Sequence, residues 1–442
     1  MIPSGGASPE HPGALLLRPH SRGEESARGA SRASGLLAGR HRDLVAGTSA
    51  LHADLHNHTD LSDGAGHAED AFACMRSAGL DAAALTDHAG FTDLDALERI
   101  REVVPWAGMP VKIITEADFV RAGELAEQAD DPGGFTAIRG FEWTTPHLGH
   151  VNVWFSRDWT PVDDRAGIQG LHEWLGTAAP GPDTLFGLNH PGREPLRFDG
   201  FAHDPRLSDR MVSMEVFNRG EDYLFEGHRL GLGSPLLECL GAGWRPGLLG
   251  VSDEHGRRWG FEPGLGRGGL WVREWSRAGV HEAMQARRFY ATREPGLRLD
   301  VVASVSRPGP AGGPSGGASG GSAGAAARLG GTLGVPTGTT ALDVDVDVDA
   351  GPASLGRELQ VQVLTTGISV PTVLAVQPVS SGTPTTVRVE LQGAWDAEEV
   401  PWLVVRVAEP SVRNLQPGPD GHPCNNRALA YASPVYLAPA GG

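Results

Sequence analysis

The chain has 442 residues, enough for two domains, and its formal net charge of -17 argues against a nucleic-acid scaffold with a broad basic surface. Lys112 is the only lysine, so a Gly-Lys-Ser/Thr phosphate loop and the nucleotidases that use it are excluded. The three cysteines, Cys74, Cys239 and Cys424, lie far apart, which disfavours thiolate zinc sites and a disulfide framework and fits a reducing compartment.

The N-terminal residues 1–48 are rich in Gly, Ala, Ser and Arg and have little hydrophobic periodicity. We expect them to form a disordered arm. The apolar run at residues 15–17 is too short for a signal peptide or a membrane anchor. We therefore expect a cytoplasmic protein that does not associate with membranes.

The next segment, residues 49–305, alternates short apolar runs with stretches of helical pattern. We expect helices over residues 68–77, 116–130, 222–241 and 277–288. This alternation predicts βα units whose parallel strands form a sheet or a barrel. Ligands of such folds bind at the carboxyl ends of the strands.

A pair of histidines, His56 and His58, follows the first apolar run of this segment. Residues two apart on a strand point to the same face, so both imidazoles can aim at one point. The Ser-Asp-Gly sequence that follows predicts a turn that can bring Asp63 toward that point. Imidazoles that converge with carboxylates suit a borderline divalent metal. The alternative for the pair taken alone is an exposed polar strand face.

Four later apolar runs also end in side chains that can bind metals. These side chains are His88, Glu142, His190, and the pair Asp253 and His255. One such ending can arise by chance, but five in one segment indicate a shared site. The rule that ligands bind at the carboxyl ends of strands points independently to the same place. The sequence therefore predicts a metal centre there.

The last third of the chain differs in character. Residues 306–330 form a Gly/Ala/Ser/Pro linker by composition. Residues 341–349 alternate apolar residues with Asp, which predicts a strand buried on one face. The Asp residues could form a calcium site, but the calcium-loop pattern is missing. The simpler interpretation is that they lie on the solvent-exposed face of the strand. Further strand-like runs predict a small all-β sandwich over residues 331–442, with a structural role.

Taken in order, the metal-type motifs resemble those of the PHP (polymerase and histidinol phosphatase) family over residues 50–300. The motifs are Asp-Leu-His-Asn-His-Thr at 54–59, Ser-Asp-Gly at 62–64, Thr-Asp-His at 86–88, Gly-Phe-Glu at 140–142, Asn-His-Pro at 189–191 and Ser-Asp-Glu-His at 252–255. The resemblance implies a distorted (β/α)7 TIM-like barrel with two or three divalent metal ions (Zn, Mn or Fe) at its C-terminal face. Members of the family include phosphoesterases and DNA-polymerase-associated domains.

A narrower resemblance links the chain to the carbaryl-hydrolase-like branch of these metallohydrolases. It rests on residues 131–135, 140–144, 149–154 and 286–292. Proteins of that branch often carry a C-terminal β-rich domain, as we expect here.

The resemblance also implies which side chains hold the metals. It assigns His56, His58, Glu142 and Asp253 to a first metal, Glu142, His150 and His190 to a second, and Asp63, His88 and His255 to a third. His147 is a rival for His150, which we prefer because it opens a strand-like run and fits the narrower motif. The position of Asp63 varies in the family, so the third metal is the least constrained.

Such a cluster would generate a metal-bound hydroxide near neutral pH, without a Ser or Cys nucleophile. The sequence therefore predicts a hydrolase of small-molecule esters, with phosphoesters preferred. The alternatives are a carboxylic or carbamate ester hydrolase on the same metals and a catalytically silent binding or regulatory module. Because the histidine ligands must be neutral, activity should fall below roughly pH 6.

Several other polar residues are candidates for supporting roles. Arg193 could bind a phosphate through its guanidinium or form an ordinary surface salt bridge, and Arg219 is a similar candidate. Asp87, beside His88, could orient a metal ligand. Glu215 and Asn218 end an apolar run and are expected to line the pocket.

Overall fold

The computed structural model describes residues 45–90, 112–145, 147–162, 166–194, 196–260, 264–306 and 326–440. The expected disordered arm falls outside these residues except for its last four, 45–48. The expected linker at 306–330 also lies mostly outside them. Its C-terminal end differs from the expectation, because Ala326–Arg328 form strand β13, which pairs with a strand of the preceding segment.

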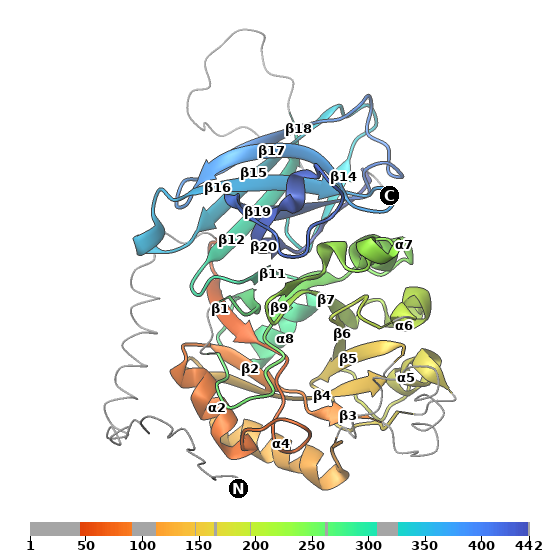
Figure 1. The fold of residues 1–442 in the computed structure, drawn as a ribbon, viewed down its shortest axis with the longest axis vertical. Coiled ribbons are helices and arrows are strands. Elements are labelled where there is room, and N and C mark those ends of the chain that lie inside the picture. Colours follow the sequence, from red (N-terminus) through yellow and green to blue (C-terminus); the bar gives the residue numbers. More distant parts are fainter. Residues whose placement is uncertain are drawn as a thin grey trace, which may run out of the picture.

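The N-terminal part is a mixed α/β structure built on one long ladder of strands (Figure 1). In spatial order the ladder runs β10 (Arg267–Val272), β1 (Ser49–Asp54), β2 (Ala82–Leu85), β4 (Thr136–Thr145), β5 (Gly149–Trp154), β6 (Leu185–Asn189), β7 (Met211–Asn218) and β9 (Gly247–Val251). The short strand β3 (His88–Ala89) adds to β4, and β8 (Glu221–Asp222) adds to β7. The strand interiors are almost entirely buried, as expected for apolar runs covered on both faces.

The directions of these strands are mixed. β1, β2 and β4 pair in parallel, and so do β6, β7 and β9. β5 is antiparallel to both of its neighbours, and β10 is antiparallel to β1. An isolated bridge also joins Asn57, which follows β1, to Glu254, which follows β9. The mixed α/β class is therefore established, whereas the (β/α)7 barrel stays a prediction.

Four helices longer than eight residues pack on this ladder within the described ranges (Figure 1). They are α2 (Ala68–Ser77), α4 (Glu116–Ala129), α5 (Gly167–Leu175) and α8 (Arg277–Gln285). The predicted helices at 68–77, 116–130 and 277–288 are confirmed to within three residues. A capping box between Thr115 and Asp118 explains why α4 begins where it does.

The predicted helix over residues 222–241 is wrong. This segment holds two 3-10 turns, η2 (Tyr223–Phe225) and η3 (His228–Leu230), followed by helix α7 (Pro235–Gly241). Gly227 and Gly231 have φ values of +79° and +77°, which end any continuous helix. The short segments α6 (Arg197–Phe201) and η1 (Pro205–Leu207) also fall outside the predicted helices.

The C-terminal part is formed by two further groups of strands. One sheet contains β13, β12 (Arg298–Val305), β15 (Ala341–Asp349) and β18 (Thr385–Glu390). The other strands are β14 (Thr332–Val335), β16 (Glu358–Thr365), β17 (Thr372–Ser380), β19 (Trp402–Arg413), β20 (Asn426–Ala432) and β21 (Val435–Pro439), and the turns η4 (Pro352–Ser354) and η5 (Pro423–Asn425) lie between strands. In β15 the residues Leu342, Val344, Val346 and Val348 are buried, which confirms the predicted one-face pattern.

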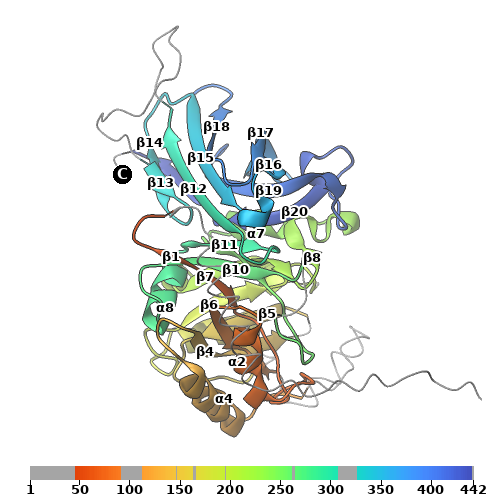
Figure 2. The same cartoon turned by 90° about the vertical axis from the view of Figure 1, so that its left-hand side faces the viewer.

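This β-rich part is joined to the N-terminal ladder. Strand β11 (Phe289–Thr292) pairs with β10 on one side and with β20 on the other, and it lies between the two parts in Figures 1 and 2. One hydrophobic cluster contains Phe217 and Leu248 together with Val404 and Tyr431. Strand β12 lies before residue 306 yet belongs to the C-terminal sheet. A self-contained all-β sandwich therefore stays a prediction. Among the described residues, no helix is long and apolar enough to cross a membrane.

Candidate metal centre

Side chains that follow β1 and β9 meet Glu142, which lies within β4, in a buried cluster. The Nε2 atoms of His56 and His58 are 3.1 Å apart. His56 Nε2 lies 3.1 Å from Oε1 of Glu142, and His58 Nε2 lies 3.3 Å from Oδ1 of Asp253. All four side chains are at most 4% exposed. The two histidines therefore converge as their spacing on a strand predicts.

Glu142 extends the cluster toward three further histidines. Its Oε1 is 3.2 Å from His150 Nδ1 and 3.6 Å from His190 Nε2. Its Oε2 is 2.6 Å from His88 Nδ1. One carboxylate thus contacts imidazoles from several strand ends, which is the arrangement expected of a bridging ligand.

A third group forms around Asp63, in the turn after β1. Its Oδ1 lies 3.5 Å from His255 Nε2, 3.6 Å from His88 Nε2 and 3.9 Å from His58 Nδ1. The turn therefore brings Asp63 back toward the histidine pair, as the Ser-Asp-Gly sequence predicts. With this group, all nine side chains of the predicted metal site lie in one cluster.

The positions of the two histidines favour His150 over His147 as a candidate ligand. Groups of at least three potential ligands in the described part of the chain include His150 twice and do not include His147. His150 points from β5 toward Glu142 and His190. Its imidazole lies 4.7 Å from that of His190, edge to face.

Glu194 is a potential ligand that sequence reasoning missed. It forms a group with His150 and His190, and its Oε1 is 3.3 Å from His190 Nδ1. Its other oxygen, Oε2, is buried and has no hydrogen-bond partner in the described structure. The residue lies in a loop after β6, and no apolar run ends at it, so the strand-end pattern could not find it. The spacing of four residues from His190 was the only signal.

The donor set fits divalent metal ions. Neutral imidazoles and carboxylates are the usual ligands of zinc, manganese and iron. The Nδ1 atoms of His58, His150 and His190 are buried and make no hydrogen bond among the described residues, although carboxylate oxygens of Asp63, Glu142 and Glu194 lie 3.9, 3.2 and 3.3 Å from them. Two ring nitrogens at 3.1 Å, as in His56 and His58, can share only one proton. A bound cation would accept the lone pairs of ring nitrogens that no hydrogen bond of the described protein satisfies.

The electrostatics of the cluster also favour a cation. Burial alone would raise the pKa of Glu142, but His150, His56 and His88 outweigh this effect and hold that pKa well below its usual range. Burial alone would lower the pKa of His56, yet Glu142 and the other nearby carboxylates raise it well above its ordinary value. Burial and the neighbouring His88 lower the pKa of His58. The cluster therefore keeps ionised carboxylates in a buried place.

A layer of polar residues positions these candidate ligands. Glu215 contacts His56 Nδ1 at 2.8 Å, and it accepts hydrogen bonds from the backbone N–H of His190 at 2.7 Å and from Asn218 Nδ2 at 2.9 Å. Such contacts set the orientation and tautomer of a ligating imidazole. Glu215 and Asn218, expected to line the pocket, lie directly behind the histidines.

Asp87 holds the turn that carries Asp63. It accepts hydrogen bonds from the backbone N–H groups of Thr59 and Ser62 at 2.7 and 3.1 Å and from their hydroxyls at 2.9 and 2.6 Å. With both carboxylate oxygens engaged in this way, Asp87 is a positioning residue for the turn.

The two candidate arginines lie in different surroundings. Arg193 makes an ion pair with Glu221 at 2.9 Å and donates a hydrogen bond to the Tyr223 hydroxyl at 2.6 Å, so the salt-bridge alternative is what the structure contains. Arg219 lies against the cluster, with Nη2 2.9 Å from His255 Nδ1 and Nε 3.4 Å from Oδ2 of Asp253. The Arg219 side chain is half exposed.

Comparison with known proteins gives a mixed result. No protein-family model matches the sequence, and no curated protein matches it. Among solved structures, the chain is similar to a two-domain protein from Bacteroides vulgatus that contains a predicted PHP-like metal-dependent phosphoesterase. The identity is 17%, the TM-score is 0.41, and the match covers 88% of this chain and 96% of that chain.

Two other solved structures match about half of the chain. A candidate metal-dependent phosphoesterase from Bifidobacterium adolescentis is 17% identical with a TM-score of 0.25, and the match covers 47% of this chain and 88% of that chain. An amidohydrolase from Chromobacterium violaceum, with bound sulfate and no metal, is 14% identical with a TM-score of 0.24. That match covers 46% of this chain and 87% of the amidohydrolase chain. Similarities this low do not assign a family or an activity, and the carbaryl-hydrolase-like resemblance stays a prediction.

Proposed function

We propose that this chain is a metal-dependent hydrolase of the PHP family that acts on phosphoesters. The observation that supports this proposal most is the convergence of nine side chains, predicted from the sequence motifs, into one cluster with unsatisfied ring nitrogens. The catalytic part would lie within residues 49–305 as a distorted (β/α)7 barrel, followed by a linker within 306–330 and by the β-rich residues 331–442, whose sheet also includes β12 and β13.

Within the proposal, the cluster divides among two or three metal ions. His56, His58, Glu142 and Asp253 would hold the first. Glu142, His150 and His190 would hold the second, with Glu194 beside it. Asp63, His88 and His255 would hold the third. Bound divalent ions would supply the positive charge that lowers the pKa of water and stabilises the charge of an ester under attack.

The other residues of the site would act on geometry and charge. Glu215 would keep the His56 imidazole turned toward Glu142, and Asp87 would keep the Asp63 turn closed. Arg219, at the edge of the cluster, would attract the negative charge of a phosphate. This cation favours phosphoesters over neutral carboxylic or carbamate esters.

The test combines metal analysis with a substrate screen. Purified chain, supplemented with Zn, Mn or Fe, would be assayed on nitrophenyl phosphate, bis(nitrophenyl) phosphate and nitrophenyl acetate. We expect two or three metals per chain and release of nitrophenol from a phosphate. His58→Ala should lose metal and at least about 100-fold in rate, because it removes a buried ligand. His228→Ala, outside the cluster, is the matched control.

Two results would contradict the proposal. Turnover of the acetate with none of either phosphate would identify a carboxylic ester hydrolase on the same metals. Well under one metal per chain, with no turnover after metal is added, would identify a silent module.

A further inference from the structure

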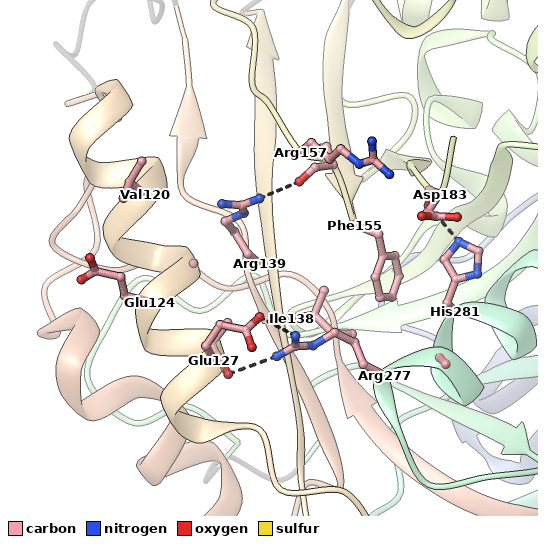
Figure 3. Close-up of a pocket in the computed structure, with 14 residues that line it drawn as sticks. Val120, Glu124, Glu127, Ile138, Arg139, Phe155, Arg157, Asp183, Arg277 and His281 are labelled. Carbon is pink, nitrogen blue, oxygen red and sulfur yellow. Dashed lines mark hydrogen bonds and ion pairs between the residues drawn. The ribbon is translucent and has the colours of Figure 1, made fainter. Parts of the chain in front are cut away.

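A pocket apart from the metal centre lies between helices α4 and α8 (Figure 3). Its volume is about 740 Å³, and none of its lining residues belongs to the candidate metal groups. Ile138 and Arg139 line it near the beginning of β4, whereas Glu142 lies farther along the same strand. The pocket is therefore a separate site with its own chemistry.

Arg139 is the partly buried cation of this pocket. Its guanidinium lies 4.1 Å above the ring of Phe119 and donates one hydrogen bond, to the carbonyl oxygen of Ser156 at 2.8 Å. No carboxylate in the described ranges forms an ion pair with it. Partial burial lowers the pKa of Arg139, and the nearby carboxylates of Glu127 and Asp158 offset this effect only in part. Most of its N–H groups are thus available to a ligand.

Arg157 is the second cation, at the rim. Its stem packs over Gly181, where an added Cβ would lie 3.1 Å from the Cδ and Nε atoms of Arg157. Its guanidinium is exposed, and the described residues offer it no hydrogen bond and no ion pair. The stem is placed by packing while the charged head is free to turn toward a ligand.

The backbone around the pocket makes room for these groups. Gly123 lies inside helix α4, where glycine is unfavourable, and a Cβ there would lie 2.8 Å from Nη1 of Arg139. Phe155 has φ +59°, a strained value for a bulky residue, and its ring meets His281 edge-on at 4.9 Å. Strain of this kind gathers at functional sites.

Among the described residues that line the pocket, unpaired positive groups outnumber unpaired negative ones. Glu127 is paired with Arg277 at 2.6 Å, and Glu124 is paired with Arg121 at 3.0 Å. Asp183 is then the one carboxylate in the described lining without an ion pair, against two arginines that have free donors. Guanidinium groups match the oxygens of phosphates and carboxylates.

We propose that this pocket binds a small organic anion. Its phosphate or carboxylate group would contact Arg139 and Arg157, and its apolar part would lie against Phe155, Ile138 and Val120. This site does not depend on the proposed metal chemistry, because none of its residues belongs to the metal groups.

The test measures binding of phenylphosphonate by calorimetry. Its carbon–phosphorus bond resists a phosphoesterase, so the probe stays intact. The full chain would be titrated when metal-loaded and after chelation, which separates this pocket from the metal centre. We expect binding to survive chelation and to weaken by about tenfold or more in Arg157→Gln, because a charge-assisted contact is lost. Arg139→Lys should weaken it as well, since the planar fork is lost.

The controls change the position of the substituted arginine and the charge of the probe. Arg229→Gln, an exposed arginine outside the pocket, should bind phenylphosphonate like the unaltered chain, and the cation benzylamine should not bind there. Arg157→Gln removes an exposed side chain, so its folding can be verified by an unchanged thermal unfolding curve. The proposal is overturned if phenylphosphonate fails to bind the chelated chain. It is equally overturned if Arg157→Gln and Arg139→Lys bind the probe as tightly as Arg229→Gln.

Discussion

At the scale of single residues, Glu142 is the side chain on which the cluster depends. Its oxygens lie within 3.6 Å of ring nitrogens from His56, His58, His88, His150 and His190, and Asn189 donates a hydrogen bond to it at 2.6 Å. A buried carboxylate is costly unless it is paired. Here the surrounding imidazoles and Asn189 offset that cost, and bound cations would offset it further.

Glu194 is not one of the nine predicted ligands, so its contribution to metal binding can be tested separately. We expect Glu194→Gln to weaken metal binding by about 10- to 100-fold, because it removes the negative charge beside His150 and His190. Chelator competition on the purified chain measures the change. Glu226→Gln is the matched control, since Glu226 is partly buried and lies outside the described metal groups. Equal metal affinity in both variants would show that Glu194 does not act on the metal.

A pH effect on stability is expected from His172 in helix α5. His172 is buried near Trp244, and burial lowers its pKa below the ordinary value of 6.5. The unfolded chain therefore binds this proton at a higher pH than the folded chain. Stability should fall as the pH drops through 6.5 toward the lowered folded pKa.

The measurement is urea unfolding of the unaltered chain and of His172→Phe at pH 7 and pH 5. The loss of stability between these two values should be smaller in the variant, which has no proton to bind at this position. An equal loss in both proteins would mean that His172 contributes nothing to the pH dependence.

At the scale of elements, the antiparallel direction of strand β5 is a feature that the motif pattern did not predict. Only residues 146–148 separate β4 from β5, and a parallel crossover needs a dozen or more residues. The short connection therefore requires a hairpin, and β5 enters the ladder in the antiparallel direction. The alternation of apolar runs and helices predicted the strands but not this reversal.

Strand β5 also supports the loop that carries the first two histidines. The indole N–H of Trp154 donates a hydrogen bond to the carbonyl oxygen of Leu55 at 2.9 Å, directly before His56. We expect Trp154→Phe to lower the free energy of unfolding by about 1–3 kcal/mol, because a buried acceptor loses its donor. Urea unfolding measures this, and metal affinity should fall with it. Trp159→Phe, where the described structure shows no indole hydrogen bond, should change neither; equal losses in both variants would contradict the role of this bond.

At the scale of the whole molecule, the predicted domains are not independent. Arg406 of β19 is fully buried and donates hydrogen bonds to the Tyr431 hydroxyl at 2.9 Å and to Gln362 at 2.6 Å. Tyr431 in turn donates to Asp222, which lies in the N-terminal ladder, at 3.1 Å. This network spans the junction that β11 and β20 form. The two parts should therefore unfold together.

The prediction at this scale concerns Arg406→Met. Removing one partner of a buried charged network should lower the free energy of unfolding by about 3–5 kcal/mol. Because the parts share a core, Trp fluorescence and loss of metal binding should report the same urea midpoint. Arg388→Met, on the exposed face of β18, should cost at most about 1 kcal/mol. Separate midpoints for the two signals would show that the parts unfold independently.

The sequence by itself determined the metal-type residues, because strand ends and the two-residue spacing of His56 and His58 are local properties of the chain. It also determined the βα alternation and the one-face burial of residues 341–349. Only the tertiary structure brought Glu194 beside His190, reversed β5 and placed Arg139 next to Gly123. Each of these depends on contacts between residues distant along the chain or within loops, where hydrophobic periodicity carries no information about direction or distance.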